Sequence, residues 1–194
     1  MVNYTAYSSD YKYPRKDIPS FTDEGIFQRG VMEAKRYKVL GHLFFSDDIL
    51  IWSDANITLT NPLDYYVKNM LKDADVMIFK HPRRRCIYQE FEVLRNTERL
   101  KDPWLQKQLV LQEQEYRKTH PKHFGLWECN FIIRRNKPEV NDLFNDWWAE
   151  ICRWQWRDQV SFPYVLNKHP KVRMSDYQGS DIRKRDDFIY LNHY

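Results

Sequence analysis

The chain has few glycines and contains none of the short motifs that mark the commonest enzyme classes. Only 5 of its 194 residues are glycine, and they form no glycine-rich loop of the kind that holds phosphates in many nucleotide-binding proteins. The GxSxG motif of serine hydrolases and the HExxH motif of zinc proteases are absent as well. These absences argue against a glycine-loop nucleotide-binding protein, a GxSxG serine hydrolase and an HExxH zinc protease.

Cysteines and long apolar runs are also scarce. Cys86, Cys129 and Cys152 lie far apart, and neither they nor the histidines have the spacing of a zinc site. Scattered thiols in odd number are typical of reduced, buried cysteines, so we expect a cytoplasmic protein, in the host cytoplasm if it is viral. We expect no targeting or transmembrane segment, because apolar runs such as Ile49–Trp52 are too short to cross a bilayer.

Charged and aromatic residues are abundant instead. Charged residues make up 30 % of the chain and aromatic residues 16 %, with 13 Tyr and 7 Trp. Such rings suit surfaces that stack on sugars or bases, although a single ring is about as often part of the core. The 31 basic residues are nearly balanced by 27 acidic ones, and this mild excess argues against binding of nucleic acid by the whole surface.

Apolar periodicity predicts short strands that alternate with helices. The expected strands are Val2–Tyr7, Ile18–Phe21, Ile49–Trp52, Val76–Phe79, Glu128–Arg134, Val172–Met174 and Phe188–Leu191. The expected helices are Val31–Phe44, Asn61–Lys72, Tyr88–Leu100, Trp104–Lys118, Val140–Ile151 and Asp158–Asn167, with Asn61 and Asp102 as caps before a proline. This order favours an α/β fold with a mixed, mostly parallel sheet and helices on both faces. The length fits a single domain over residues 1–194, alone or as one module of a longer protein.

The most informative local pattern follows the apolar strand Ile49–Trp52. Asp54 and Asn56 come just after its end, and strand alternation directs both side chains to one side. Two oxygen ligands can hold a hard cation such as Mn²⁺ or Mg²⁺, which would neutralise a departing diphosphate. A simple Asx turn that ends the strand is the alternative.

Asp54-Ala55-Asn56 resembles the DxD element of glycosyltransferases with the GT-A fold. Further blocks resemble, in the expected order, a small glycosyltransferase-like family. That family includes plant proteins once described as domains of unknown function and the N-terminal domain of capsid-glycan transferases from large algal viruses. The blocks are Ala34–Lys38 with Leu43–Phe45, His81–Arg83 with Tyr88–Glu90, Gly125–Asn130 with Ile132–Arg135, Trp147-Trp148 and Arg157–Ser161.

The resemblance implies a GT-A-like hexosyl- or deoxyhexosyltransferase. Its donor would be a nucleotide diphosphate sugar, with a UDP-sugar expected, and its acceptor a glycan or a protein-linked glycan. Mn²⁺ or Mg²⁺ would assist the reaction, with Asp54, Asn56 and His193 as the implied metal ligands and His169 as a weaker candidate. Asn56 departs from the family pattern, because a carboxylate is common at that position. The Asp-Gln pair at Asp158 favours retention of the anomeric configuration.

The resemblance also implies roles for residues outside the metal site. Asp158, Glu128 and Gln159 would stabilise the positive charge that develops on the sugar during transfer. Asp158 has a structural alternative as the cap of the helix that follows it. Tyr7 or Tyr13 would stack on the base, and arginines would contact the diphosphate. The implied donor-binding set is Thr5, Tyr7, Arg15, Arg36, Lys38, Ser53, His81, Arg83 and Asn130.

Two other functions remain open at this point. Asn56, in place of a carboxylate, favours a non-catalytic module that binds a sugar or a nucleotide. The run Arg83–Arg85, the many aromatic residues and a pI of about 8.8 favour a nucleic-acid-binding protein, although the interspersed acidic residues argue against it.

Overall fold

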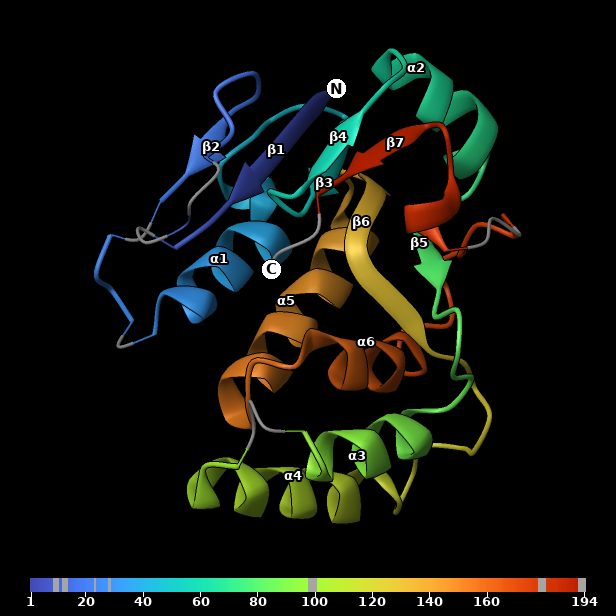
Figure 1. The fold of residues 1–194 in the computed structure, drawn as a ribbon. Helices are drawn as coiled ribbons and strands as arrows, with labels where there is room; N and C mark the ends of the chain where they lie inside the picture. The colour runs from blue at the N-terminus through green and yellow to red at the C-terminus, as the bar shows by residue number, and fades with distance from the viewer. Residues whose placement is uncertain are drawn as a thin grey trace.

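A five-stranded sheet organises the fold (Figure 1). The structure is a computed structural model that describes residues 1–8, 11, 14–22, 24–27, 29–97, 101–177 and 181–191. The strands lie in the order β2-β1-β3-β6-β5, and β6 alone runs opposite to the rest. This arrangement confirms the predicted α/β class with a mixed, mostly parallel sheet. The strands are β1 (Val2–Ala6), β2 (Ser20–Phe21), β3 (Ile49–Ser53), β5 (Val76–Lys80) and β6 (Trp127–Arg135).

Helices cover both faces of this sheet, as predicted. One face packs against α1 (Gly30–Val39), α5 (Pro138–Arg153) and α6 (Asp158–Leu166), and the pair α3 (Ile87–Arg95) and α4 (Pro103–Tyr116) lies beneath α6 (Figure 1). The other face packs against α2 (Leu63–Tyr66), its π-helical continuation η2 (Val67–Leu71) and a small antiparallel sheet. That sheet pairs β4 (Ile57–Leu59) with β7 (Phe188–Tyr190), and the short turns η1 (Gly41–Leu43) and η4 (Ile182–Lys184) complete the fold.

The sequence patterns explain most of these elements. Successive residues of β3 point to opposite faces, so Leu50 and Trp52 enter the helical core while Ile51 enters the core on the other face. The predicted apolar stripe of α5 is almost completely buried. At the start of α4, the Leu105 N–H donates to Asp102 Oδ1 at 3.1 Å, which confirms the predicted cap.

Several boundaries differ from the predictions. The helix predicted over Val31–Phe44 ends at Val39, where the chain tightens into η1. At α2, Pro62 takes an extended conformation at the cap position, so Asn61 does not cap the helix. The strand predicted at Val172–Met174 is a single bridge from Met174 to Val76, and β4 was not predicted. Cys86 and Cys129 are buried as expected, whereas Cys152 is exposed.

The early end of α1 follows from the close approach of Gly41 to the first strand. Tyr4 Oη donates to the carbonyl of Lys38 at 3.2 Å, and a Cβ at Gly41 would lie 2.0 Å from that hydroxyl oxygen. The buried Arg134 guanidinium lies on the same side and packs 3.8 Å over the Phe144 ring. Only a glycine therefore lets the chain pass this point. Within the described residues, no helix is both long and apolar enough to cross a membrane.

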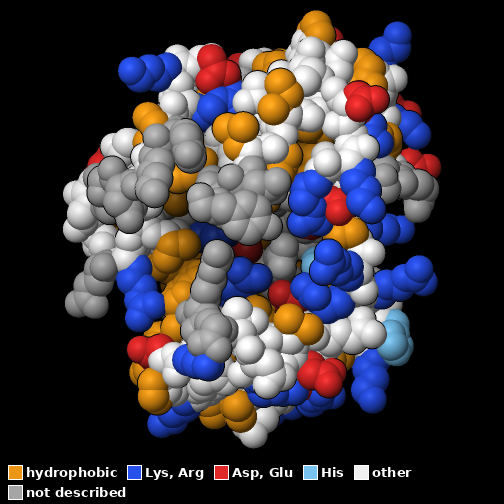
Figure 2. Space-filling model, in the orientation of Figure 1, with side chains coloured by type: hydrophobic (Ala, Val, Ile, Leu, Met, Phe, Trp, Pro, Cys, Tyr) orange, Lys and Arg blue, Asp and Glu red, His pale blue; other side chains and the backbone are white. Residues whose placement is uncertain are grey.

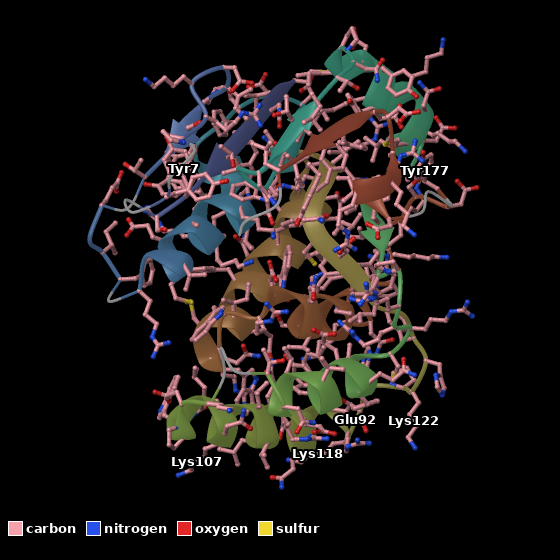
Figure 3. The ribbon with its side chains drawn as sticks, in the orientation of Figure 1. Tyr7, Glu92, Lys107, Lys118, Lys122 and Tyr177 are labelled. Carbon is pink, nitrogen blue, oxygen red and sulfur yellow. The ribbon has the colours of Figure 1, made fainter. Side chains whose placement is uncertain are left out.

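We predict that Gly41→Ala lowers the free energy of unfolding by about 1–3 kcal/mol, because the added methyl group overpacks the contact with Tyr4. Urea unfolding followed by circular dichroism measures this loss. Lys107→Ala, at an exposed position of α4 (Figure 3), is the control and should leave the midpoint unchanged. An unchanged midpoint in Gly41→Ala would show that the contact relaxes at no cost.

Candidate functional site

Part of the predicted site lies together at one edge of the sheet, where Lys38 contacts Asp54 and Asp158. The carboxyl ends of β1 and β3 lie there beside the amino-terminal part of the reversed strand β6. Directly after β3, the Asp54 N–H donates to the carbonyl of Asn130 at 2.8 Å. Ligands of open α/β sheets bind at this kind of edge.

Two lysines of α1 bind the carboxylates at this edge. Lys38 Nζ lies 2.8 Å from Asp158 Oδ2 and 3.5 Å from Asp54 Oδ1, and Lys35 Nζ lies 2.5 Å from the same oxygen of Asp158. We call these four residues the lysine–aspartate cluster. Lys35 and Lys38 share a helix face because they are three residues apart, and this face looks toward the end of β3.

The cluster is charged at neutral pH despite its burial. Burial would raise the pKa of Asp158, but the ammonium groups of Lys35 and Lys38 outweigh it and hold that pKa well below its usual range. Burial likewise opposes the charge of Lys38, yet the carboxylates of Asp158 and Asp54 raise its pKa above the ordinary value. Burial lowers the pKa of Lys35, and the carboxylate of Asp158 opposes this decrease. The formal charges of the two lysines and the two aspartates cancel.

A cavity of about 210 Å³ opens beside the cluster, and we call it the lysine cavity. Lys35, Lys38 and Asp54 line one side of it, and Tyr7 and Tyr11, with ring centroids 5.6 Å apart, line another. Figure 3 shows Tyr7 near β1 and α1. The cavity thus combines aromatic rings with cations, a combination that suits a base and a phosphate group.

The described residues do not by themselves fit a bound divalent cation. Asp54 Oδ1 accepts a hydrogen bond from Trp52 Nε1 at 2.8 Å and faces the Lys38 ammonium. The Asn56 amide donates to the carbonyl of Leu191 at 3.2 Å. No three His, Cys, Asp or Glu side chains within the described ranges lie together as a ligand set. His193 is outside those ranges, so the predicted Mn²⁺ or Mg²⁺ stays a prediction.

Glu128 and Asn130 on β6 carry acceptor atoms without partners. Glu128 Oε1 lies 3.0 Å from the guanidinium of Arg183, whereas Glu128 Oε2 and Asn130 Oδ1 are buried and bond to no described residue. Burial raises the pKa of Glu128, Arg183 opposes the rise, and the charges of Asp181 and Asp54 add to it. Unpaired buried acceptors are rare in folded proteins, so these two oxygens are candidates to accept hydrogen bonds from a ligand.

Strand alternation is interrupted in this part of β6. Cys129 and Ile132 both enter the helical core although they are three residues apart, and the pairing with β5 shifts register here. Regular alternation along β6, on which the prediction of a shared face for Glu128 and Asn130 depended, therefore does not hold here.

Asp158 does not cap its helix. Arg157 holds the cap position without a side-chain bond, while the Asp158 carboxylate binds the two lysines. The capping alternative is therefore wrong. Gln159, its predicted partner, is partly exposed next to the cluster.

Other predicted residues lie apart from the lysine cavity. Ser53 Oγ donates to Asn3 within the core, and Thr5 is fully buried. Arg15 binds Asp17 and the carbonyl of Ile57, and it lines a different cavity next to residues 1–3. Arg36 stacks on Tyr37 and Phe44, and His169 pairs with Asp146. Tyr13 lies outside the described residues.

His81 and Arg83 lie in a second, larger cavity of about 810 Å³, which we call the basic cavity. Its lining includes Lys80, residues 83–85, Phe124, Trp127, Asp181 and Lys184. Figure 2 shows Lys and Arg side chains gathered to the right of centre, over the region where β5 ends. His81 Nδ1 accepts the N–H groups of Arg83 and Arg84 at 3.1 and 3.0 Å, which folds this loop back on itself.

Sequence reasoning missed Lys35 and Arg183. Lys35 was within reach, because its spacing from Lys38 already put both ammonium groups on one helix face. Arg183 gave no such signal, since it reaches Glu128 from a turn 55 residues further along the chain.

Comparison with known proteins places this chain in a family. The family model described as TOD1/MUCI70, glycosyltransferase-like domain, matches residues 23–187. The chain belongs to this family. The matched range contains the whole lysine–aspartate cluster together with Glu128 and Asn130. No curated protein matches the chain.

Solved structures of glycosyltransferases are distantly similar to this TOD1/MUCI70-family chain. One is mouse xyloside xylosyltransferase 1 in its apo form, with 17% identity, a TM-score of 0.38, and coverage of 71% of this chain and 48% of that one. Another is apo WbbM, a bifunctional glycosyltransferase, with 9% identity, a TM-score of 0.43, and coverage of 85% and 37%. The chain therefore spans less than half the length of each.

We predict that Asp158→Asn lowers the free energy of unfolding at pH 7 by about 3–5 kcal/mol, because it leaves two buried ammonium groups without their shared carboxylate. The depressed pKa of Asp158 means that its contribution is present above the unfolded-state pKa of about 3.9 and is lost as the pH falls below it. The difference between variant and wild type should therefore shrink below pH 4.

Urea unfolding from pH 7 to pH 3 measures both effects. Glu115→Gln removes a surface pair with Lys118 and is the matched control, for which we expect little change. A constant difference between Asp158→Asn and wild type over this pH range would contradict the role of the ion pairs.

Proposed function

We propose that the chain is a glycosyltransferase whose lysine cavity binds the diphosphate of a nucleotide-sugar donor, expected to be a UDP-sugar. One observation carries the proposal: the buried Lys38 and the partly buried Lys35 line a cavity at the carboxyl ends of β1 and β3, in a chain of a glycosyltransferase-like family. The acceptor would be a glycan or a protein-linked glycan.

Donor binding would use the contrast between the two aspartates. Asp158 binds both lysines tightly, whereas Asp54 is 3.5 Å from Lys38 and its side chain is 39% exposed. A diphosphate can therefore compete for Lys38 on the Asp54 side without breaking the pairs to Asp158. Tyr7 and Tyr11 supply rings on which a base can stack.

The transfer step follows from these positions. The bond between the anomeric carbon and the phosphate oxygen breaks, and its electron pair leaves with the diphosphate beside the lysines, whose charge stabilises it. Glu128 and Asn130 would hold the hydroxyl groups of the sugar with their unpaired oxygens and stabilise its positive charge. The acceptor oxygen bonds to the anomeric carbon, and its proton passes to the departing phosphate on the same face, which retains the anomeric configuration.

Asp158 acts in this proposal as a positioning residue. Its carboxylate is bound by both lysines, so it sets where their charges lie, and it is not among the described residues that line the cavity.

A non-catalytic binding module is the second candidate. The observation in its favour is that the Asn56 amide donates to the carbonyl of Leu191, so the second position of the DxD-like motif has a structural role. Slow hydrolysis of a bound nucleotide sugar, followed by release of free nucleotide diphosphate, separates an enzyme from a module that binds without turnover.

We predict that a saturating UDP-sugar raises the melting temperature of the protein by several degrees. A ligand at 100 times its Kd stabilises a protein by about 2.7 kcal/mol, and about 1 kcal/mol shifts a domain of this size by about 2–4 °C. A thermal-shift panel of nucleotide sugars, each with Mn²⁺ and with EDTA, measures the donor preference and the predicted metal dependence together.

Ala34→Phe tests where the donor binds. Ala34 lines the lysine cavity from α1, so the larger ring should fill the cavity and remove the shift while leaving the ion pairs in place. Leu111→Phe, at an exposed position of α4, is the control and should keep the shift. A panel without any stabilising nucleotide sugar, or an unchanged shift in Ala34→Phe, would refute the donor site.

A further inference from the structure

The basic cavity is separate from the lysine cavity but adjoins the same reacting region. Among the described residues that line the two cavities, none is shared. Trp127 lines the basic cavity, and the next residue, Glu128, feels the charges of both Asp54 and Arg84. The basic cavity therefore adjoins the part of β6 that carries Glu128.

The positive charge of the whole chain is concentrated in this cavity. Five cationic side chains and one carboxylate line it, which gives a formal net charge of +4. The entire chain has the same net charge of +4, so the remaining residues balance one another. A focused positive field in a concave site attracts anions far more than the same charges spread over a surface.

Four of the five cations form no salt bridge within the described part of the chain, although the charge of Lys184 acts on the nearby Asp181. They are Lys80 at the end of β5, Arg83 and Arg85 in the next loop, and Lys184 in η4. Arg84, in contrast, is paired with Glu90, and Asp181 with Arg183. Cations without salt bridges that come together from two separate stretches of the chain, residues 80–85 and η4, repel one another without a ligand.

The floor of the cavity is aromatic. Phe124 is 37% exposed, and its ring centroid lies 6.1 Å from that of Trp127. Gly125 has a φ of +139°, and a Cβ there would lie 2.6 Å from the Trp127 ring, so only glycine lets the loop cross it. Rings beside cations suit a sugar that also carries negative charge, because the ring faces stack on its apolar side.

We propose that the basic cavity is the acceptor subsite and that it recognises an anionic glycan, one that carries carboxylate, sulfate or phosphate groups. This inference rests on the proposed glycosyltransferase function and names the substrate class on its acceptor side. Arg83, Arg85, Lys80 and Lys184 bind the anionic groups, while Trp127 and Phe124 support the sugar rings. The volume of about 810 Å³ has room for more than one sugar unit.

His81 is part of the frame of this subsite. Burial and the neighbouring Arg84 lower the pKa of His81 to about 4, so the ring is neutral at physiological pH. A neutral Nδ1 can accept the two backbone N–H groups that direct the arginine loop toward the cavity. The role of His81 is thus to position this loop.

Matched oligosaccharides test the proposal on the wild-type protein. The probes are a defined oligouronate, the same oligomer after reduction of its carboxyl groups to alcohols, and a sulfated oligosaccharide of similar length. We expect the charged probes to bind in calorimetry at least tenfold more tightly than the reduced one, with an affinity that falls as salt rises. Equal binding of the reduced and unreduced oligomers would overturn the proposal, and the sulfated probe shows which anionic group is preferred.

The double variant Arg83→Gln/Arg85→Gln locates the site. We expect it to weaken the charged oligosaccharide about tenfold or more and to leave the urea midpoint unchanged, because both side chains lack ion pairs with described residues. Lys68→Gln/Lys107→Gln removes two exposed cations elsewhere and is the control. Undiminished binding of the charged oligosaccharide by the arginine variant would overturn the proposal. The proposal would also fail if the wild-type protein bound a single-stranded oligonucleotide of equal charge more tightly than the oligosaccharide and the arginine variant lost that binding.

Donor binding separates this inference from the function on which it rests. The arginine variant should keep the thermal shift produced by the nucleotide sugar, because its substitutions lie outside the lysine cavity. Oligouronate binding without any donor shift would contradict the proposed function, whereas a donor shift without discrimination between charged and reduced oligomers would contradict the acceptor class alone.

Discussion

The carboxylate of Asp158, shared by Lys35 and Lys38, is the interaction on which the candidate site depends. It joins the start of α6 to one face of α1, and Lys38 extends the contact to Asp54 at the end of β3. Burying these charges is costly, and mutual pairing offsets the cost only while all partners are present. The same ion pairs that connect the helices to the sheet edge therefore also hold two ammonium groups beside the lysine cavity.

The two cavities differ in how their charge is balanced, and this difference favours different ligands. The formal charges of the lysine–aspartate cluster cancel, so a diphosphate would bind there only by replacing the weak contact between Lys38 and Asp54. The basic cavity has four cations that form no salt bridge in the described chain, so an anion would be attracted there directly. Glu128 directly follows Trp127 of the basic cavity in the chain, and the charges of Asp54 and Arg84 both act on its pKa. In the proposed reaction, a donor and an acceptor would thus both lie near this carboxylate.

The sequence predicted those features that depend on local periodicity. The apolar run of β3 and the stripe of α5 were sufficient to place the sheet edge and one covering helix, and the position of Asp54 after β3 followed. Features set by distant contacts could not be predicted. Nothing near Arg15 indicates that its side chain binds Ile57, and nothing near Gly41 shows that Tyr4 ends α1. The break of alternation in β6 depends on its pairing with β5 and has no local signal.

Asn56 shows why the motif resemblance alone is not enough to assign a metal ligand. Its side-chain amide donates to the carbonyl of Leu191, and its backbone carbonyl accepts the Leu191 N–H at 2.9 Å, so two hydrogen bonds hold the chain just after β7. An aspartate at this position would bring two acceptors face to face and lose one of the bonds. A second carboxylate at this position, next to Asp54, would therefore loosen the segment beside β7. The positive charge next to Asp54 in the described structure is supplied by Lys38, which the fold already holds in place.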